Sequence, residues 1–351
     1  MALVFVAAAW MLGFVVMSLA IGQLGWDVRF AYLPAADAVL DGRSPYPALD
    51  DPILLDQKGY VYPPQLLFLV LPLTWLPDAV VGALVAGTLI ALVLLTLRML
   101  GVTDPRCYAA AFLWMPTMSG VLLANVSIPL ALAAAVVWKY RDEVWPPAVA
   151  LGLTVSAKLL FWPLFVWTLA TRRARATAWA IVLGLGVTLA AWAAIGFDGL
   201  TGYPDLLRRL SELQSENSYS FVGIADALGL PEWMGRAAML LAGGTLLAWC
   251  VVFARRGDDF RSFTAALGAT LALSPIVWLH YLVVLLVPMA IARPRFSALW
   301  LLPILLWSSP KPGYAEGFQT FPPAIVATIL LVVLLTRPRV IRAGRPAVTP
   351  A

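Results

Sequence analysis

Residues 25–64, GWDVRFAYLPAADAVLDGRSPYPALDDPILLDQKGYVYPP, form the polar segment around which this sequence is organised. The segment carries six aspartates and three basic residues, and apolar sequence dominates both before and after it. Because a polar insert of this size between two apolar segments is unusual, we interpret it as the surface on which the chemistry takes place. The apolar segments would then be the frame that holds this surface at a membrane face.

The overall composition is that of a membrane protein. Of the 351 residues, 62% are hydrophobic and only 12% are charged, and the mean hydropathy is +0.86. Soluble domains carry roughly 25% charged residues. Long apolar runs separated by short charged or proline-rich breaks are typical of membrane-spanning helices, whereas outer-membrane barrels show alternating patterns. The sequence therefore predicts an all-α polytopic membrane protein.

The apolar runs set the number of crossings. At about 20 residues for each crossing, the chain has room for about 10–12 transmembrane helices. The predicted segments are 2–24, 62–76, 79–97, 107–122, 125–138, 146–170, 176–196, 234–254, 262–279, 281–292, 296–308 and 320–336. Segments 62–76, 125–138 and 281–292 are short, so each could be re-entrant. The first run is longer than a signal peptide's apolar core, and we expect a retained first helix.

Arginine-rich breaks predict the orientation. Four breaks, at 171–176, 254–261, 293–295 and 337–345, fall on one side and hold 12 of the 24 basic residues. The positive-inside rule makes that side cytoplasmic. Residues 1–342 would then form a single transmembrane domain, followed by a cytoplasmic tail at 343–351. The loops predicted on the outside are 25–61, 197–233 and 309–319.

The loop at 197–233 has an amphipathic pattern. Apolar side chains recur at helical spacing, while Arg208, Arg209 and Glu212 fall between them. The apolar positions are Leu200, Tyr203, Leu206, Leu207, Leu210 and Leu213. This pattern predicts a helix that lies on the outer membrane interface.

Asp27 is the candidate catalytic residue, because it stands at the outer mouth of the first helix. A carboxylate at the edge of the hydrocarbon can be partly desolvated, which raises its basicity. The alternative is a solvated aspartate that only ends a helix. Asp37, Asp41, Asp50, Asp51 and Asp56 are weaker candidates in the same segment.

Three polar residues within apolar runs are further candidates. Lys158 lies inside segment 146–170, where a lysine is costly and indicates a partner for an anionic group. His280, the only histidine, could bind a phosphate or transfer a proton, or be a hydrogen-bonded structural residue. For Asn125, we expect a hydrogen bond between helices.

Metal, cofactor and nucleic-acid functions have little support in the sequence. Cys107 and Cys250 are far apart in or beside apolar runs, and a single histidine does not make a zinc site. The positive charge of +5 is explained by arginines at segment ends. We therefore expect no metal, no cofactor and no nucleic-acid partner.

The order of several motifs resembles that of a known family. Trp26-Asp27 is followed by AYLPAADAVLDGRSPY, by Tyr62-Pro63-Pro64, by LGLTVSAKLLFWPL, by ENSYSF and by SPIVWLHY. From about residue 20 to 320, this order is similar to glycosyltransferase family 87, the polyprenol-phosphate-mannose-dependent transferases of actinobacteria, which have the GT-C membrane fold. The best-known members add α-1,2-mannose to phosphatidylinositol mannosides or lipomannan.

The resemblance implies a function for each matching position. Asp27 matches the general base of an inverting transferase, and His280 and Lys158 match positions that could contact the donor phosphate. Other residues in the shared motifs would shape the substrate site, namely Trp26, Tyr62, Pro63, Pro64, Asn217 and Trp278. The implied partners are a polyprenyl-phosphate sugar donor, a glycolipid acceptor and membrane lipids. The implied location is the plasma membrane, with the active site on the extracytoplasmic side.

Two points stay open at the level of sequence. The donor sugar could be mannose or arabinose, since the outer loops are compact and depart from the family pattern. A transporter or flippase of lipid-linked sugars is the alternative from another class, and an assembly scaffold is a third. Transporters often show repeat symmetry and polar groups near the bilayer midplane. No internal repeat is visible here, which favours the transferase.

Overall fold

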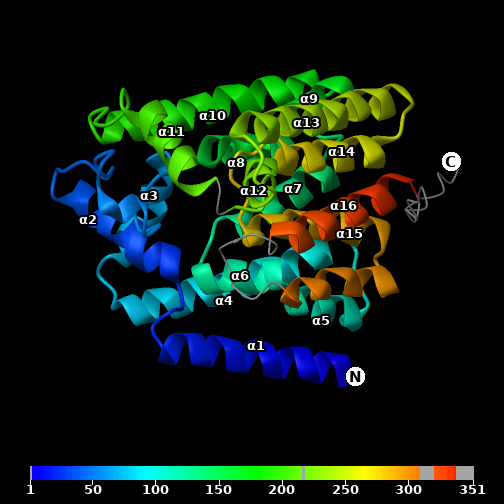
Figure 1. Cartoon of the computed structure of the whole chain (residues 1–351), viewed down its shortest axis with the longest axis horizontal. Helices are drawn as coiled ribbons and strands as arrows, with labels where there is room; N and C mark the ends of the chain where they lie inside the picture. The colour runs from blue at the N-terminus through cyan, green and yellow to red at the C-terminus, as the bar shows by residue number, and fades with distance from the viewer. Residues whose placement is uncertain (1, 216–217, 309–319, 337–351) are drawn as a thin grey trace, which may run out of the picture.

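The computed structural model describes residues 2–215, 218–308 and 320–336, and regular structure within these ranges is helical, without a strand. This confirms the predicted all-α fold. Asn217, the loop at 309–319 and the tail at 343–351 lie outside the described residues. Most helices run along one long direction, and α2 (Leu33–Leu40), α3 (Gln65–Val70) and α11 (Tyr203–Gln214) gather at one end of them, on the left in Figure 1.

Four of the described helices are long and apolar enough to cross a bilayer alone. They are α1 (Ala2–Ala20), α4 (Asp78–Met99), α10 (Ala174–Ala194) and α13 (Glu232–Arg255). Large apolar side chains on them face outward, such as Phe5 and Leu241, each 72% exposed. An apolar surface of this kind suits contact with lipid, and the chain is a multi-pass membrane protein.

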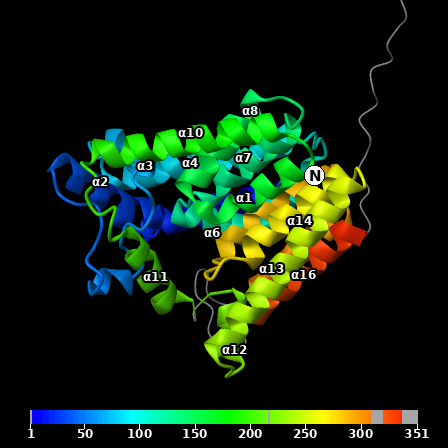
Figure 2. The same cartoon turned by 90° about the horizontal axis from the view of Figure 1, so that it is seen from above.

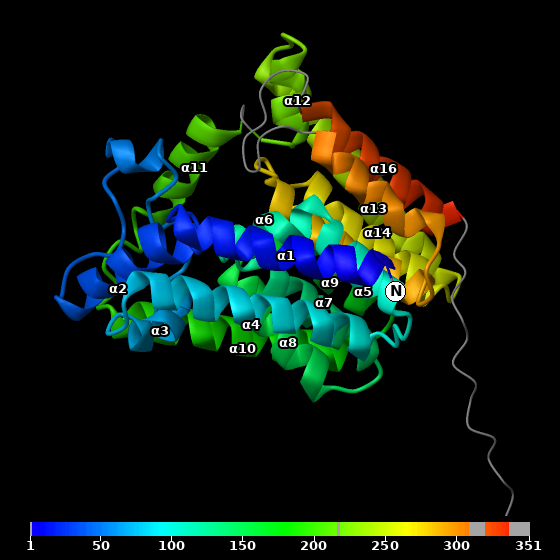
Figure 3. The ribbon, with the colours of Figure 1, turned by 90° about the horizontal axis from the view of Figure 1, so that it is seen from below.

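The other predicted segments form shorter apolar helices. These are α5 (Pro105–Leu113), α6 (Met115–Leu123), α7 (Ser127–Lys139), α8 (Trp145–Ala157), α9 (Pro163–Ala170), α14 (Asp259–Ala272), η5 (Leu279–Leu285), α15 (Leu286–Ala292), η6 (Ala298–Ser308) and α16 (Phe321–Thr336). The helix α12 (Phe221–Ala227) belongs instead to the loop between α10 and α13. Figures 2 and 3 show α11 and α12 projecting from the helical body on one side.

Segment 62–76, which the sequence left open as a crossing or a re-entrant piece, is too short to cross the membrane alone. It forms only the six-residue α3, which begins after Pro64, and a 3₁₀ turn that contains Pro72, and Pro77 then precedes the first turn of α4. Its far end returns to the first polar segment, where Asp78 lies 4.0 Å from Arg29. The segment is therefore re-entrant.

The expectation that segment 146–170 is one crossing is wrong. Lys158 has an extended backbone, with φ −153° and ψ 109°, and it separates α8 from η4 (Leu159–Phe161) and α9. Asp142, before α8, and Arg173, after α9, form an ion pair at 2.9 Å. Because the two ends of the segment meet, the chain runs inward to Lys158 and back again.

A similar return occurs at Asn125. Helices α6 and α7 meet at 118° around a short break, in which Ala124 has a left-handed φ of 55°. The break interrupts the apolar run where the sequence predicted two segments, 107–122 and 125–138. Asn125 and Lys158 thus stand at the turning points of two returning helix pairs.

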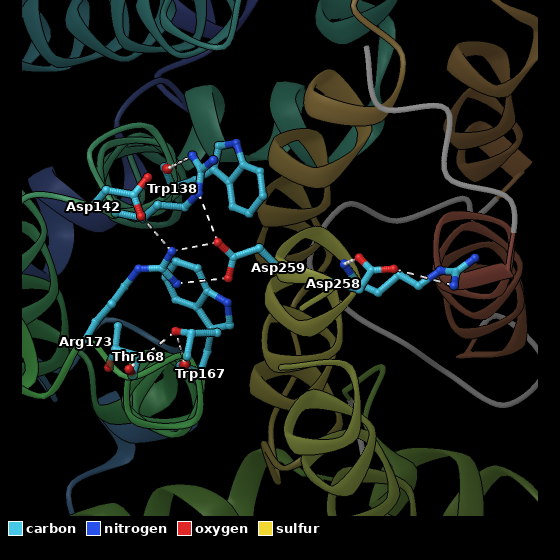
Figure 4. Close-up of polar contacts among 10 residues, drawn as sticks. Trp138, Asp142, Trp167, Thr168, Arg173, Asp258 and Asp259 are labelled. Carbon is cyan, nitrogen blue, oxygen red and sulfur yellow. Dashed lines mark hydrogen bonds and ion pairs between the residues drawn. The ribbon is translucent and has the colours of Figure 1, made fainter. Parts of the chain in front are cut away.

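Basic side chains collect at the end opposite to these turning points, which we call the basic end. Arg98, Lys139 and Arg255 lie in the last turns of α4, α7 and α13. Asp259 accepts hydrogen bonds there from Arg141 at 3.2 Å and from both Arg173 terminal nitrogens at 2.9 and 2.6 Å (Figure 4). The network joins α7, α10 and α14 at one level.

Tight contacts between small residues hold the helices together. A Cβ on Gly152 of α8 would lie 2.6 Å from the Ala180 carbonyl oxygen of α10, and one on Gly184 would lie 3.0 Å from the Gly152 oxygen. Helices in membranes associate closely through such small residues. This packing fixes α8, and with it the position of Lys158.

Candidate active site

A cavity of about 700 Å³ lies where the first polar segment, α11 and the two helix breaks meet. Most residues expected at the substrate site line it: Trp26, Asp27, Tyr62, Pro63, Lys158, Trp278 and His280. Pro64 is absent from the lining and instead precedes the first turn of α3. The structure thus brings together side chains that are up to 253 residues apart in sequence, from Asp27 to His280.

The backbone around Gly25 sets the position of Asp27. The Gly25 N–H donates to the Leu122 carbonyl oxygen at 2.7 Å, which ties the segment to the end of α6. Gly25 has a φ of +78°, and a Cβ there would lie 2.8 Å from the Gly82 Cα. Arg29 closes the turn by donating to the Gly22 carbonyl oxygen at 3.0 Å. Only glycine meets both demands at position 25.

Asp27 is partly buried beside polar groups from other elements. Its Oδ2 accepts a hydrogen bond from Asn125 Nδ2 at 2.6 Å. Burial raises the pKa of Asp27 from 3.8 to about 6, while the Asn125 hydrogen bond and the positive charge of Lys158 partly oppose this rise. A carboxylate with a pKa near 6 is ionised at neutral pH and more basic than a solvated one, which suits a general base.

Lys158 presents a buried cation to the cavity. Its Nζ is buried without a hydrogen-bond partner among the described residues. It lies 3.5 Å from the ring centroid of Tyr281 and 5.4 Å from that of Tyr62. Aromatic faces stabilise a cation without satisfying its N–H groups, so this ammonium has three donors available to an anion.

His280 is also buried without a partner. It is 3% exposed, and neither ring nitrogen finds a hydrogen-bond partner within the described part of the chain. Its ring packs edge to face on Tyr281, with centroids 5.0 Å apart. Buried polar groups are almost always hydrogen-bonded. The arrangement gives no support to a purely structural hydrogen-bonding role and leaves both nitrogens for a bound molecule.

The amphipathic helix α11 forms part of the cavity wall. Leu207 and Leu210, on its apolar face, line the cavity. Tyr203 Oη donates to the Val61 carbonyl oxygen at 2.9 Å, and Gln214 Nε2 donates to the Leu54 carbonyl oxygen at 3.0 Å. The prediction that the apolar face lies on the membrane interface is wrong for these residues, since they face the cavity.

Sequence reasoning missed two members of the site. Asn125 was expected to bond between helices, but its amide reaches the carboxylate of Asp27 in the first polar segment. Tyr281 follows His280 directly and supports Lys158. An isolated amide at a break in an apolar run was the available signal for Asn125, whereas Tyr281 ends the motif SPIVWLHY, in which only Trp278 and His280 were given a role.

No group of three or more histidine, cysteine, aspartate or glutamate side chains within the described residues could hold a metal ion. The cavity instead offers one carboxylate, one buried ammonium and one imidazole among aromatic and aliphatic side chains. Such a site can take a proton from a hydroxyl group and hold an anionic group nearby.

Comparisons with known proteins agree with this chemistry. The model of glycosyltransferase family 87 matches residues 60–277, more than half of the chain. The chain is 24% identical to the polyprenol-phosphate-mannose-dependent alpha-(1-2)-phosphatidylinositol pentamannoside mannosyltransferase of Mycobacterium tuberculosis. The 268 aligned residues cover 71% of this chain and 58% of that protein. The chain is 25% identical over 264 residues to an alpha-(1->3)-arabinofuranosyltransferase of the same species, covering 70% and 60% of the two chains.

The chain therefore spans somewhat less than two thirds of the length of these relatives. No solved structure matches it. The matched range includes Tyr62, Asn125 and Lys158, while Asp27 precedes it and His280 follows it. On the strength of this match, the chain belongs to glycosyltransferase family 87.

Proposed function

We propose that the chain is an inverting glycosyltransferase that moves mannose from a polyprenyl-phosphate donor to a glycolipid acceptor of the phosphatidylinositol mannoside or lipomannan type, forming an α-1,2 linkage. One observation carries the proposal. A partly buried carboxylate shares a single cavity with a buried ammonium and a buried imidazole, neither of which has a hydrogen-bond partner among the described residues. The mannosyltransferase relative supports the choice of sugar and acceptor.

Asp27 is the general base in this proposal. Its carboxylate takes the proton of the acceptor hydroxyl, whose oxygen attacks the anomeric carbon on the side opposite to the phosphate. The bond between that carbon and the phosphate oxygen breaks, and polyprenyl phosphate leaves with the electron pair. The products are the glycosylated acceptor and polyprenyl phosphate, and Asp27 passes its proton to water. A single displacement of this kind inverts the anomeric configuration.

Lys158 and His280 hold the phosphate of the donor. The negative charge on the leaving phosphate increases during the reaction, so a nearby fixed cation stabilises the transition state more than the ground state. Aromatic side chains around them, including Tyr62, Trp278 and Tyr281, keep water from the reacting carbon.

The distribution of charge supports an active site on the outer face of the plasma membrane. Basic residues collect at the end of the helical body opposite to the cavity, at the ends of α4, α7 and α13. The positive-inside rule places such an end in the cytoplasm. The cavity would then open towards the extracytoplasmic side, where a lipid-linked donor enters from the bilayer.

The test is transfer of radiolabel from polyprenol-phosphate mannose to phosphatidylinositol mannosides by purified protein in liposomes. Asp27→Asn keeps the shape of the side chain but cannot take a proton, and we expect transfer to fall roughly 10²- to 10⁴-fold. Asp37→Asn is the matched control, since Asp37 is exposed in the same segment and does not line the cavity. Equal transfer by the Asp27 variant and wild type would refute the role of the base.

The arabinosyltransferase relative justifies a second donor in the same assay. Label from polyprenol-phosphate arabinose, but none from the mannose donor, would keep the mechanism and change the sugar. Absence of transfer from both donors, together with counterflow of a labelled lipid-linked sugar in proteoliposomes, would replace the transferase with a flippase.

A further inference from the structure

The side chain of Asn125 has a fixed orientation. Its Oδ1 accepts two hydrogen bonds from Ser127, from the backbone N–H at 3.0 Å and from Oγ at 2.8 Å. A backbone N–H can only donate, so the amide oxygen must face Ser127 and the amide NH₂ must face Asp27. Asn125 is 2% exposed, which leaves the amide little freedom to turn.

The fixed NH₂ group reaches one oxygen of the Asp27 carboxylate. Nδ2 donates to Oδ2 at 2.6 Å, and within the described residues the structure records no hydrogen bond to the other carboxylate oxygen, Oδ1. The bond joins the break between α6 and α7 to the first polar segment. It holds the plane of the carboxylate and leaves Oδ1 available to a hydroxyl group in the cavity.

We propose that Asn125, oriented by Ser127, is a positioning residue that keeps Asp27 as an ionised, correctly directed base. The proposal rests on the proposed function, in which Asp27 takes a proton. The Asn125 hydrogen bond also lowers the pKa of Asp27 against the effect of burial, so its loss should raise that pKa. Other titratable or charged groups around Asp27 belong to several elements: Arg29, Tyr32, Tyr62, Lys158, His280 and Tyr281.

A purely structural role for Asn125 is the competing explanation. Its bonds to Ser127 are those of a side chain that starts a helix, and aspartate fills such a position as well as asparagine does. The backbone bond between Gly25 and Leu122, at 2.7 Å, ties the first polar segment to α6 without this side chain. Asn125→Asp therefore keeps the bonds to Ser127 and removes the amide donor, which faces Asp27 and the Tyr62 hydroxyl.

The kinetic test compares Asn125→Asp with Ser127→Ala at several pH values. In Asn125→Asp two carboxyl groups face each other and share a proton, which raises the pKa of the pair. We expect kcat at pH 7 to fall at least about 100-fold. We also expect the acid limb of the pH profile to move up by more than about one unit, with a smaller change in KM. Ser127→Ala keeps the donor, so its acid limb should stay in place. A folded Asn125→Asp variant with the rate and pH profile of wild type would overturn the proposal.

A titration without turnover separates this proposal from the proposed function. The titration follows the infrared carboxyl band of Asp27 as a function of pH. To isolate this band, the spectrum of the same protein carrying Asp27→Asn is subtracted from that of each protein. We expect its midpoint to be higher in Asn125→Ala than in wild type by about one unit, whether or not sugar is transferred. Equal midpoints would reject the role of Asn125 even in an active transferase. If Asn125→Ala does not fold, Asn125→Asp replaces it in the same subtraction.

Discussion

The pKa of Asp27 predicts the pH dependence of transfer. Burial raises this pKa from 3.8 to about 6, and only the ionised form accepts a proton. The rate should therefore fall as the pH drops through 6. With a pKa of about 6, roughly a tenth of the enzyme is ionised at pH 5, so kcat/KM should be about tenfold below its plateau. With the ordinary value of 3.8, more than about nine tenths would still be ionised.

The assay is the initial rate of sugar transfer from pH 4.5 to 8 at constant ionic strength, in liposomes of fixed composition. The phosphodiester of the donor is ionised throughout, so its titration does not contribute. A histidine has an ordinary pKa of about 6.5, and His280→Gln is therefore the essential control. We expect this variant to be slower but to keep the acid limb. A limb that disappears in His280→Gln, or a wild-type rate that is level down to pH 5, would refute the assignment of the limb to Asp27.

Three further predictions concern the support of the site. Lys158→Met should lower transfer at least about 100-fold, because the leaving phosphate loses its cation. It should also move the acid limb of the pH profile to higher pH, because Asp27 loses a nearby positive charge. An unchanged rate would show that Lys158 is not part of the site. Gly82→Ala should lower the stability of the fold by about 1–3 kcal/mol and lower activity, because its Cβ would lie 2.8 Å from the Leu24 carbonyl oxygen. Its control, Gly87→Ala on the same helix, meets open space and should melt at or above the wild-type temperature. Asp259→Asn should destabilise the protein by about 2 kcal/mol in thermal unfolding, since two arginines lose their carboxylate, while loss of the carboxylate of Asp142, which is 76% exposed, should cost less than about 1 kcal/mol.

The sequence was sufficient for the class of fold and for several residues of the cavity wall. Composition and apolar runs predict a polytopic helical protein, and isolated polar residues in those runs identified Lys158 and His280. Both side chains line the cavity. A polar side chain in an apolar segment is costly, which is why the sequence drew attention to them.

Where the chain crosses between the basic end and the cavity, and where it turns back, was not predictable in the same way. An apolar run of 25 residues, 146–170, reads as one crossing, although the backbone turns back at Lys158. At 62–76 the short length of the apolar run already left a re-entrant segment open, and the helix there has only six residues. Hydropathy measures what can be buried in lipid, and it does not record the direction of the chain. Asn125 was misjudged for a related reason, because its partner is 98 positions away.

The returning pair α8–α9 has a consequence for where the reaction takes place in the bilayer. Helix α8 has 13 residues and is therefore about 20 Å long, whereas the hydrocarbon core is about 30 Å thick. Measured from the basic end, its tip at Lys158 falls about 10 Å short of the opposite surface. The donor phosphate would have to sink below the level of the lipid headgroups to reach it. Free water is scarce at that depth, so the activated sugar would meet the acceptor hydroxyl before it could be lost to hydrolysis.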